Sequence, residues 1–175
     1  LPTGNGIDII EGVPCTLIDN GMPCIVLLAQ DVGASGYETR EALDADAALK
    51  ARIEAIRLVA GPLMNLGDVA EQSVPKIMLV APPREGGAIT VRSFIPKRAH
   101  ASIGVLGAIS VASACFVEGS PASRVARVNG NSPYTLSVEH PSGETTCVVE
   151  VVGREIVGAA MVRTARKLFD GVVFG

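Results

Sequence analysis

The chain has 175 residues, enough for one substantial domain or two small ones. Hydrophobic residues make up 48% of it, yet there is no Trp and only 3% are aromatic, so the core must be built from Val, Ile, Leu and Ala. The net charge is −3, and no basic stripe with interleaved aromatic residues is present, which excludes the usual patterns of nucleic-acid binding.

The first thirty residues predict three short strands punctuated by Gly and Pro, namely Ile7–Ile10, Cys15–Ile18 and Cys24–Ala29. Between the second and third lies DNGMP (Asp19–Pro23), which predicts a tight turn because Asn-Gly tolerates positive φ. Asn20 would have a functional role only if this turn faced a pocket.

Residues 44–62 predict an amphipathic helix, with Asp44 as its N-cap. The apolar stripe consists of Leu49, Ile53, Ile56, Ala60 and Leu63. Asp46 and Lys50 have the i,i+4 spacing of a favourable ion pair. Gly61-Pro62 predicts an end or a kink.

Two strands, Lys76–Pro82 and Ala88–Ile95, come next, and Gly86-Gly87 between them predicts a hairpin. They are followed by Ala101–Val117, a run of 17 residues without a charge. This run could be a membrane span, a core helix, or a helix whose first turn takes part in chemistry.

The uncharged run is too short, and too rich in Ala, Ser and Gly, for a membrane span of about 20 strongly apolar residues. A helix that is apolar on all sides is instead one that protein encloses on all sides. It would be roughly 25 Å long. The sequence therefore predicts that the rest of the domain wraps around this helix.

The last third of the chain predicts further strands at Tyr134–Glu139, Thr145–Val152, Glu155–Arg163 and, at the end, Gly171–Phe174. Strands then outnumber helices by about four to one, which predicts an α+β fold.

The four cysteines, Cys15, Cys24, Cys115 and Cys147, form no C-x-x-C pair, and the two histidines lack metal-ligand spacing. We therefore expect no metal site, and buried, reduced thiols in a cytoplasmic protein. Cys115, deep in the uncharged run, is expected to be inert. The chain begins LPTGNG, with no signal peptide and no initiator Met, which suggests a fragment or an excised domain.

The segment KRAHASIG (residues 97–104) is the first candidate for anion binding. A helix N-terminus has unpaired N–H groups and a partial positive charge. The residues expected there are mostly small and follow three basic side chains: Ala101, Ser102, Ile103 and Gly104, after Lys97, Arg98 and His100. A carboxylate could approach such a backbone closely. Alternatively, Ser102 caps the helix and the basic side chains are only solvated, and the residues alone favour neither interpretation.

A second candidate is EHPSGE (Glu139–Glu144), where His140 ends a strand before a Pro-Ser-Gly turn. A plain hairpin with an exposed histidine is the favoured interpretation. The imidazole, the Ser142 hydroxyl and a Gly N–H could also hold a carboxylate or an enolate oxygen. The basic run Arg163–Lys167 is a solvated face or a clamp for a polyanion. From the residues alone we predict only that the domain binds an acidic small molecule against another part of the protein.

Six segments, in this order, resemble the PrpF-type isomerases of the diaminopimelate-epimerase-like fold: LIDNGMPCIVLLAQDVG, LKARIEAIRLVAGPLMNLG, VPKIMLVAPP, HASIGVLGAIS, VEHPSGE and VRTARKLFDGVVF. The resemblance covers nearly the whole chain. It implies two similar lobes, each a β-barrel-like sheet wrapped around a central apolar helix, with the substrate between them. Because such proteins are about twice this length, residues 1–175 would be a single domain, the C-terminal half.

The resemblance also implies an activity, a proton shift next to a carbonyl or carboxylate group of a tricarboxylic acid, in bacterial gallate breakdown. A base removes the α-proton, an enolate forms, and a proton returns elsewhere. The alternatives are cis–trans isomerisation of an aconitate-like acid, and a non-catalytic acid-binding module. No metal or organic cofactor is implied.

The family's catalytic Lys or Cys candidates belong to the absent N-terminal half, so the isolated chain is expected to be inactive. The substrate-binding residues implied for this half are Asn20, His100, Ala101, Ser102, Ile103, His140 and Ser142. The implied partners are a di- or tricarboxylate and the N-terminal half, with a homodimer left open and no nucleic acid or membrane.

Two departures distinguish the chain from the related epimerases. HASIG stands where those enzymes have Cys-Gly-Thr-Gly, so we expect no mechanism with two thiols. Gly21-Met22-Pro23 stands where they have Gly-Asn-Pro, so an asparagine contact is lost at Met22.

Overall fold

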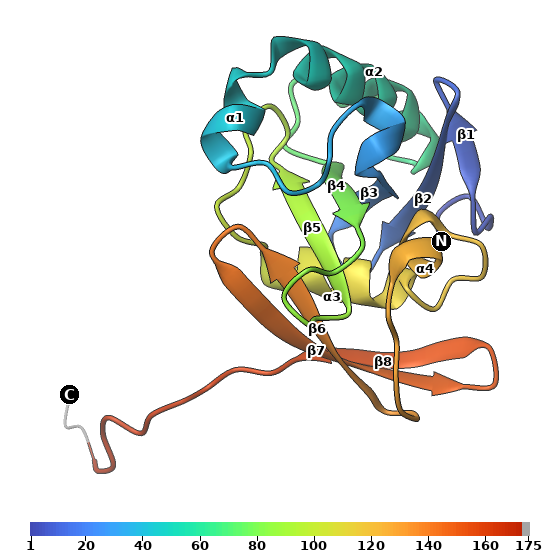
Figure 1. The fold of residues 1–175 in the computed structure, drawn as a ribbon. Helices are drawn as coiled ribbons and strands as arrows, with labels where there is room; N and C mark the ends of the chain where they lie inside the picture. The colour runs from blue at the N-terminus through green and yellow to red at the C-terminus, as the bar shows by residue number, and fades with distance from the viewer. Residues whose placement is uncertain (173–175) are drawn as a thin grey trace.

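A computed structural model describes residues 1–172 (Figure 1). Eight strands form one mixed sheet: β1 (Asp8–Ile10), β2 (Val13–Asp19), β3 (Pro23–Leu28), β4 (Lys76–Ala81), β5 (Ile89–Phe94), β6 (Tyr134–His140), β7 (Gly143–Val152) and β8 (Glu155–Met161). The helices are α1 (Arg40–Ala45), α2 (Ala47–Leu63), α3 (Val105–Ala114), α4 (Pro121–Val125) and the 3-10 turn η1 (Ala29–Val32). The α+β prediction is confirmed.

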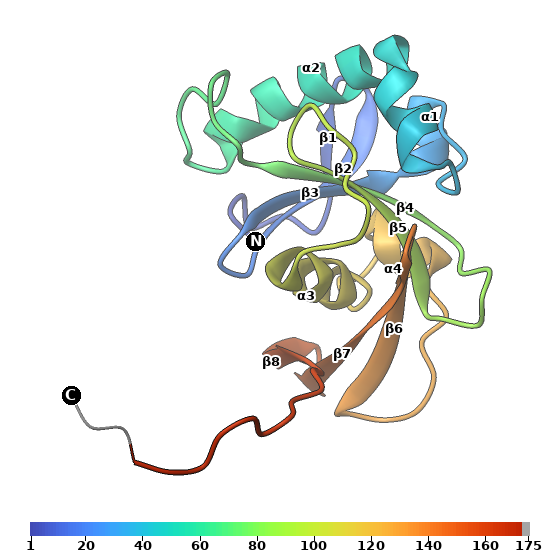
Figure 2. The ribbon, with the colours of Figure 1, turned by 90° about the vertical axis from the view of Figure 1, so that its left-hand side faces the viewer.

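The strands lie in the sheet in the same order as in the chain. Neighbours are antiparallel except β3 with β4 and β5 with β6, which are parallel. These two pairs are joined by the helical crossovers, α1–α2 and α3–α4 respectively, because parallel strands need a long connection. Figure 2 shows α1 and α2 on one face of the sheet and α3 on the other.

Each helical layer covers its own hydrophobic core. Successive side chains of a strand point to opposite faces, so in β3 Ile25 and Leu27 pack under α2, while Val26 and Leu28 pack against α3. Strands β3 and β4 are therefore buried on both sides, which explains their unbroken apolar sequences.

The predicted β-barrel-like closure is wrong: the sheet is open, with β1 and β8 as its edges. Its curvature still brings β2, β3, β4, β6, β7 and β8 into contact with α3. At one edge the three-residue β1 pairs with β2 and packs against α2, and at the other edge β8 pairs with β7.

The predicted central helix is also shorter than expected. Helix α3 begins at Val105 rather than Ala101, with Gly104 as an N-cap that makes no side-chain hydrogen bond. Residues 101–103 stay outside the helix because local contacts hold this segment: the His100 N–H donates to the Ser93 carbonyl, and the Ser102 N–H to the His100 ring. Burial begins at Gly107, so the first turn of α3 is not enclosed.

The predicted helix 44–62 is in fact two helices. Asp46, not Asp44, is the N-cap of α2, and its carboxylate accepts from the Leu49 N–H at 2.8 Å. Asp44 lies within α1 and accepts from the Ala99 N–H at 2.7 Å. Within residues 1–172 no ion pair joins Asp46 to Lys50, since the cap occupies the carboxylate. Leu63, assigned to the buried stripe, is 46% exposed.

The other predicted strands are confirmed to within a few residues, and β4 and β5 form the predicted antiparallel pair around Gly86-Gly87. The exception is the C-terminus. Strand β8 ends at Met161, and residues 162–172 are exposed and lie outside any strand. Of the predicted strand Gly171–Phe174, residues 171 and 172 are therefore not in a strand, and the remainder lies outside the described residues. Figure 1 shows this tail, with Arg163–Lys167, leaving the body of the domain.

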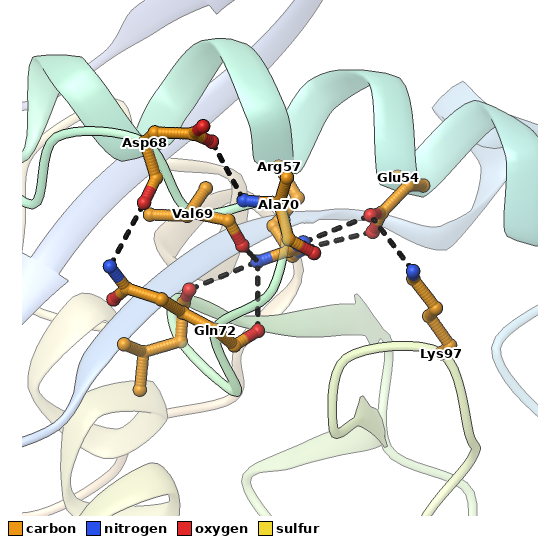
Figure 3. Close-up of polar contacts among 8 residues, drawn as sticks. Glu54, Arg57, Asp68, Val69, Ala70, Gln72 and Lys97 are labelled. Carbon is orange, nitrogen blue, oxygen red and sulfur yellow. Dashed lines mark hydrogen bonds and ion pairs between the residues drawn. The ribbon is translucent and has the colours of Figure 1, made fainter.

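A fully buried arginine ties α2 to the loop that follows it (Figure 3). The Arg57 guanidinium donates to both carboxylate oxygens of Glu54, at 2.8 and 2.9 Å. It also donates to four backbone carbonyls of the loop, those of Val69, Ala70, Gln72 and Val74. Glu54 in turn lies 4.0 Å from the Lys97 amine, so the same cluster reaches the segment that leads to His100.

Candidate active site

Two of the motifs singled out in the sequence meet at one cleft. A cavity of about 430 Å³ is lined by Ala101 and Ser142, and one of about 610 Å³ is lined by His140. The two cavities share Tyr37, Arg92 and Pro141. We refer to both together as the His140 cleft.

His100 has a defined ring orientation. Its Nδ1 atom accepts from the Ser102 N–H at 3.1 Å, and the Ser102 hydroxyl oxygen lies 3.4 Å from the same atom. Because Nδ1 accepts, the ring proton must be on Nε2, which makes Nε2–H a hydrogen-bond donor. Ile103 differs from its neighbours, since its side chain is buried in the core beside α3.

His140, at the end of β6, is half-buried and held from both ring nitrogens. Its Nε2 lies 3.2 Å from the Thr145 hydroxyl oxygen and its Nδ1 lies 3.3 Å from that of Ser142. Burial, together with the positive charge of Arg92, lowers the pKa of His140. The imidazole is therefore neutral at pH 7 and can both donate and accept a hydrogen bond.

Next to His140 lies a residue that the sequence analysis did not select, Glu139. The residue is 5% exposed, and its carboxylate accepts from the N–H groups of Arg84, Glu85 and Gly87, each at 2.8 Å. It also accepts from the Thr90 hydroxyl at 2.6 Å. Burial alone would raise the pKa of Glu139, but these hydrogen bonds outweigh it and lower the pKa. Glu139 thus pins the β4–β5 turn to the wall of the cleft.

We expect the Glu139→Gln variant to lose less stability than the unmodified protein as the pH falls from 7 to 3. A carboxyl whose pKa is lowered in the fold stabilises it above its unfolded pKa, and this contribution is lost as the pH falls through the folded pKa. Melting temperatures between pH 7 and pH 3 test this, with the exposed Glu155→Gln as control. Equal acid sensitivity in Glu139→Gln and the unmodified protein would contradict it.

Two arginines line the same cleft. The Arg84 guanidinium stacks on Tyr37, with its carbon 3.3 Å from the ring centre, and the Tyr37 hydroxyl donates to the Pro82 carbonyl at 2.9 Å. Arg92, only 8% exposed, donates from Nε to the Glu38 carbonyl and from Nη1 to the Val91 carbonyl. Neither arginine stands out in the sequence, because their partners, except Val91, lie more than forty residues away in the chain.

Asn20 does not join this cleft. The predicted turn is present, with Gly21 at φ +84°, but the Asn20 amide donates to the Ser113 hydroxyl on α3 at 3.1 Å. It lines a different cavity of about 570 Å³, together with Phe116 and Tyr134. The structure therefore brings together His140, Ser142 and Ala101, and leaves Asn20 apart. The other predicted residues, His100, Ser102 and Ile103, line neither cavity of the His140 cleft.

The chain offers no activated thiol. All four cysteines are free and buried, as predicted. Burial raises the pKa of Cys15, Cys24 and Cys115 to about 12, and that of Cys147 to about 11. Over residues 1–172, no three His, Cys, Asp or Glu side chains are grouped so that they could hold a metal ion. None of the helices described has the length and apolarity needed to cross a membrane.

Comparison with known proteins identifies the family of the chain. The family model described as PrpF protein matches residues 1–175, so the chain belongs to the PrpF family. In structure, a crystal structure of methylitaconate-delta-isomerase superposes with a TM-score of 0.87 at 24% identity, over 98% of this chain and 50% of that one.

Among curated relatives, the chain is 66% identical over 175 residues to (4E)-oxalomesaconate Delta-isomerase of Novosphingobium sp. strain KA1. It is 57% identical over 173 residues to 4-oxalomesaconate tautomerase of Pseudomonas putida. These alignments cover 99% of this chain and 49% and 48% of the relatives, so the chain spans about half the length of the curated relatives it matches.

Proposed function

We propose that this chain is the C-terminal half of a two-lobed isomerase that moves a proton next to a carbonyl or carboxylate of 4-oxalomesaconate. The observation that carries the proposal is the 66% identity, over the full chain, to an oxalomesaconate Delta-isomerase. The meeting of the HASIG and EHPSGE segments in one cleft supports it, because both were selected for their capacity to hold a carboxylate.

In this proposal the chain holds and polarises the substrate. The His100 Nε2–H donates to a substrate oxygen, and the uncapped first turn of α3, exposed at Val105 and Leu106, supplies backbone N–H groups for a carboxylate. The neutral imidazole of His140 gives up its contact with the exposed Ser142 hydroxyl and donates from Nδ1–H to the oxygen on which negative charge develops as the enolate forms. The N-terminal half supplies the base that removes the α-proton.

The proposal is tested with the full-length protein and two substrates. Absorbance should follow turnover of the oxalomesaconate keto form, with much slower turnover of methylaconitate. The 175-residue chain alone should show no activity, because the base lies in the other half. Faster turnover of methylaconitate would favour an aconitate-type cis–trans isomerase. Turnover by the chain alone would place the base here, and no turnover of either acid by the full-length protein would favour an acid-binding module.

A further inference from the structure

We propose that Arg84 and Arg92 together bind one carboxylate of the substrate in the His140 cleft, in addition to the carboxylate at the first turn of α3. This subsite makes the site prefer tricarboxylic acids over dicarboxylic acids. The identity of that acid rests on the function proposed above. The subsite itself rests on geometry, on charge and on the hydrogen-bonding capacity that these two side chains leave unused.

The two guanidinium groups face one space from different elements. Arg84 lies on the β4–β5 turn and Arg92 on β5, and both line the cavity of about 610 Å³ that His140 also lines. Like charges that share a cavity repel each other, and an anion between them attracts both and so offsets that repulsion. A carboxylate with two acceptor oxygens matches the forked geometry of guanidinium donors.

Both arginines keep donors free for such an anion. Within residues 1–172 neither takes part in an ion pair. Arg92 is 8% exposed, and its two hydrogen bonds use Nε and Nη1, which leaves Nη2 available. Arg84 is held by stacking on Tyr37, a contact that uses the face of the guanidinium and leaves its N–H groups free in the plane.

The acidic side chains of the cleft do not supply the missing partner. Glu139 already accepts four hydrogen bonds from the β4–β5 turn and Thr90. Glu144 accepts from the Ser137 hydroxyl, and Glu38 accepts from the N–H groups of Ser35 and Gly36. Glu85 and Glu41 also line the cleft, but within residues 1–172 neither forms an ion pair with Arg84 or Arg92.

Contacts among the residues that line the cleft hold the two arginines in place before any ligand binds. Glu139 fixes the backbone of Arg84, and Gly87 allows this approach, because a Cβ there would lie 2.8 Å from the Glu139 Cγ. The Tyr37 hydroxyl donates to the Pro82 carbonyl, which holds in place the ring on which Arg84 stacks. A preorganised site loses less conformational entropy on binding.

The test compares two unreactive acids that differ by one carboxylate, propane-1,2,3-tricarboxylate and propane-1,3-dicarboxylate. Calorimetry on the full-length protein should give a Kd at least tenfold lower for the tricarboxylate. Arg84→Met keeps an apolar contact with Tyr37 and should abolish this preference while changing dicarboxylate binding less than threefold. Arg92→Lys should reduce the preference as well. Arg154→Met, an exposed arginine outside the cleft, is the matched control and should change nothing.

Equal binding of the two acids, or equal weakening of both by Arg84→Met, would overturn the inference. The measurement does not depend on turnover, so it separates the two proposals. If the full-length protein prefers the tricarboxylate through Arg84 but fails to convert oxalomesaconate, the subsite stands and the proposed reaction falls. If it converts oxalomesaconate and Arg84→Met leaves the preference intact, the proposed reaction stands and the subsite falls.

Discussion

Replacing Arg57 with Ala is expected to lower the free energy of unfolding by about 3–5 kcal/mol. The side chain is completely buried, and its removal leaves four backbone carbonyls of the loop 69–74 without their donor. It also removes the hydrogen bonds and the positive charge that lower the pKa of Glu54. Urea unfolding of the full-length protein, followed by circular dichroism, measures the loss.

Two further variants show whether the guanidinium fork or only its volume matters. Arg57→Met fills much of the space but satisfies no carbonyl, so it should destabilise nearly as much as Arg57→Ala. Arg52→Ala is the matched control on the same helix, since Arg52 is exposed and makes one surface hydrogen bond, to Glu11. Its effect should stay within about 0.5 kcal/mol. A loss for Arg57→Ala no larger than this would show that the buried cluster adds nothing to stability.

The second large effect is expected on catalysis: His100→Ala should lower kcat/KM for oxalomesaconate by about a hundredfold without unfolding the full-length protein. The reason is that the His100 ring, held by the Ser102 N–H on Nδ1, donates from Nε2–H to a substrate oxygen, and the variant leaves that oxygen without its hydrogen bond. Steady-state rates and a melting curve on the same sample are sufficient.

Two isosteric changes separate substrate binding from loop structure. His100→Asn retains an acceptor near the position of Nδ1 and should preserve the contact with Ser102, but it lacks the Nε2 donor and should be as slow as His100→Ala. His100→Gln places a donor near the position of Nε2 and should recover part of the rate. Unchanged kcat/KM in His100→Ala, or full activity in His100→Asn, would exclude this role.

Local patterns in the sequence identified most strands, because alternation and Gly-rich turns are local signals. The long apolar run identified the packed helix but not its start. The segment before α3 is held as a loop by the His100 N–H, which donates to the Ser93 carbonyl, and the Ser102 N–H, which donates to the His100 ring, and composition does not reveal these bonds. The prediction that Asp44 caps the helix was wrong for a similar reason. By sequence Asp44 and Asp46 fit the N-cap position equally well, but the Asp44 carboxylate accepts from the distant Ala99 N–H.

Much of the site could not be predicted because it depends on pairing between distant strands. His140 and Ser142 stood out as a histidine and a hydroxyl in a turn, and the structure places them in a cleft. Glu139 did not stand out, because its donors lie about fifty residues away on the β4–β5 turn. Arg57 did leave a local signal: it falls four residues after Ile53 and three before Ala60, on the buried face of α2.

The agreement between strand order and chain order has a consequence for synthesis on the ribosome. Every strand from β2 to β8 finds its first neighbour among residues that have already emerged, so the sheet can grow from one edge as translation proceeds. No strand has to wait for a later one to be inserted beside it. Only two steps, the crossovers through α1–α2 and α3–α4, delay the next pairing, and these should set the pauses in nascent-chain folding.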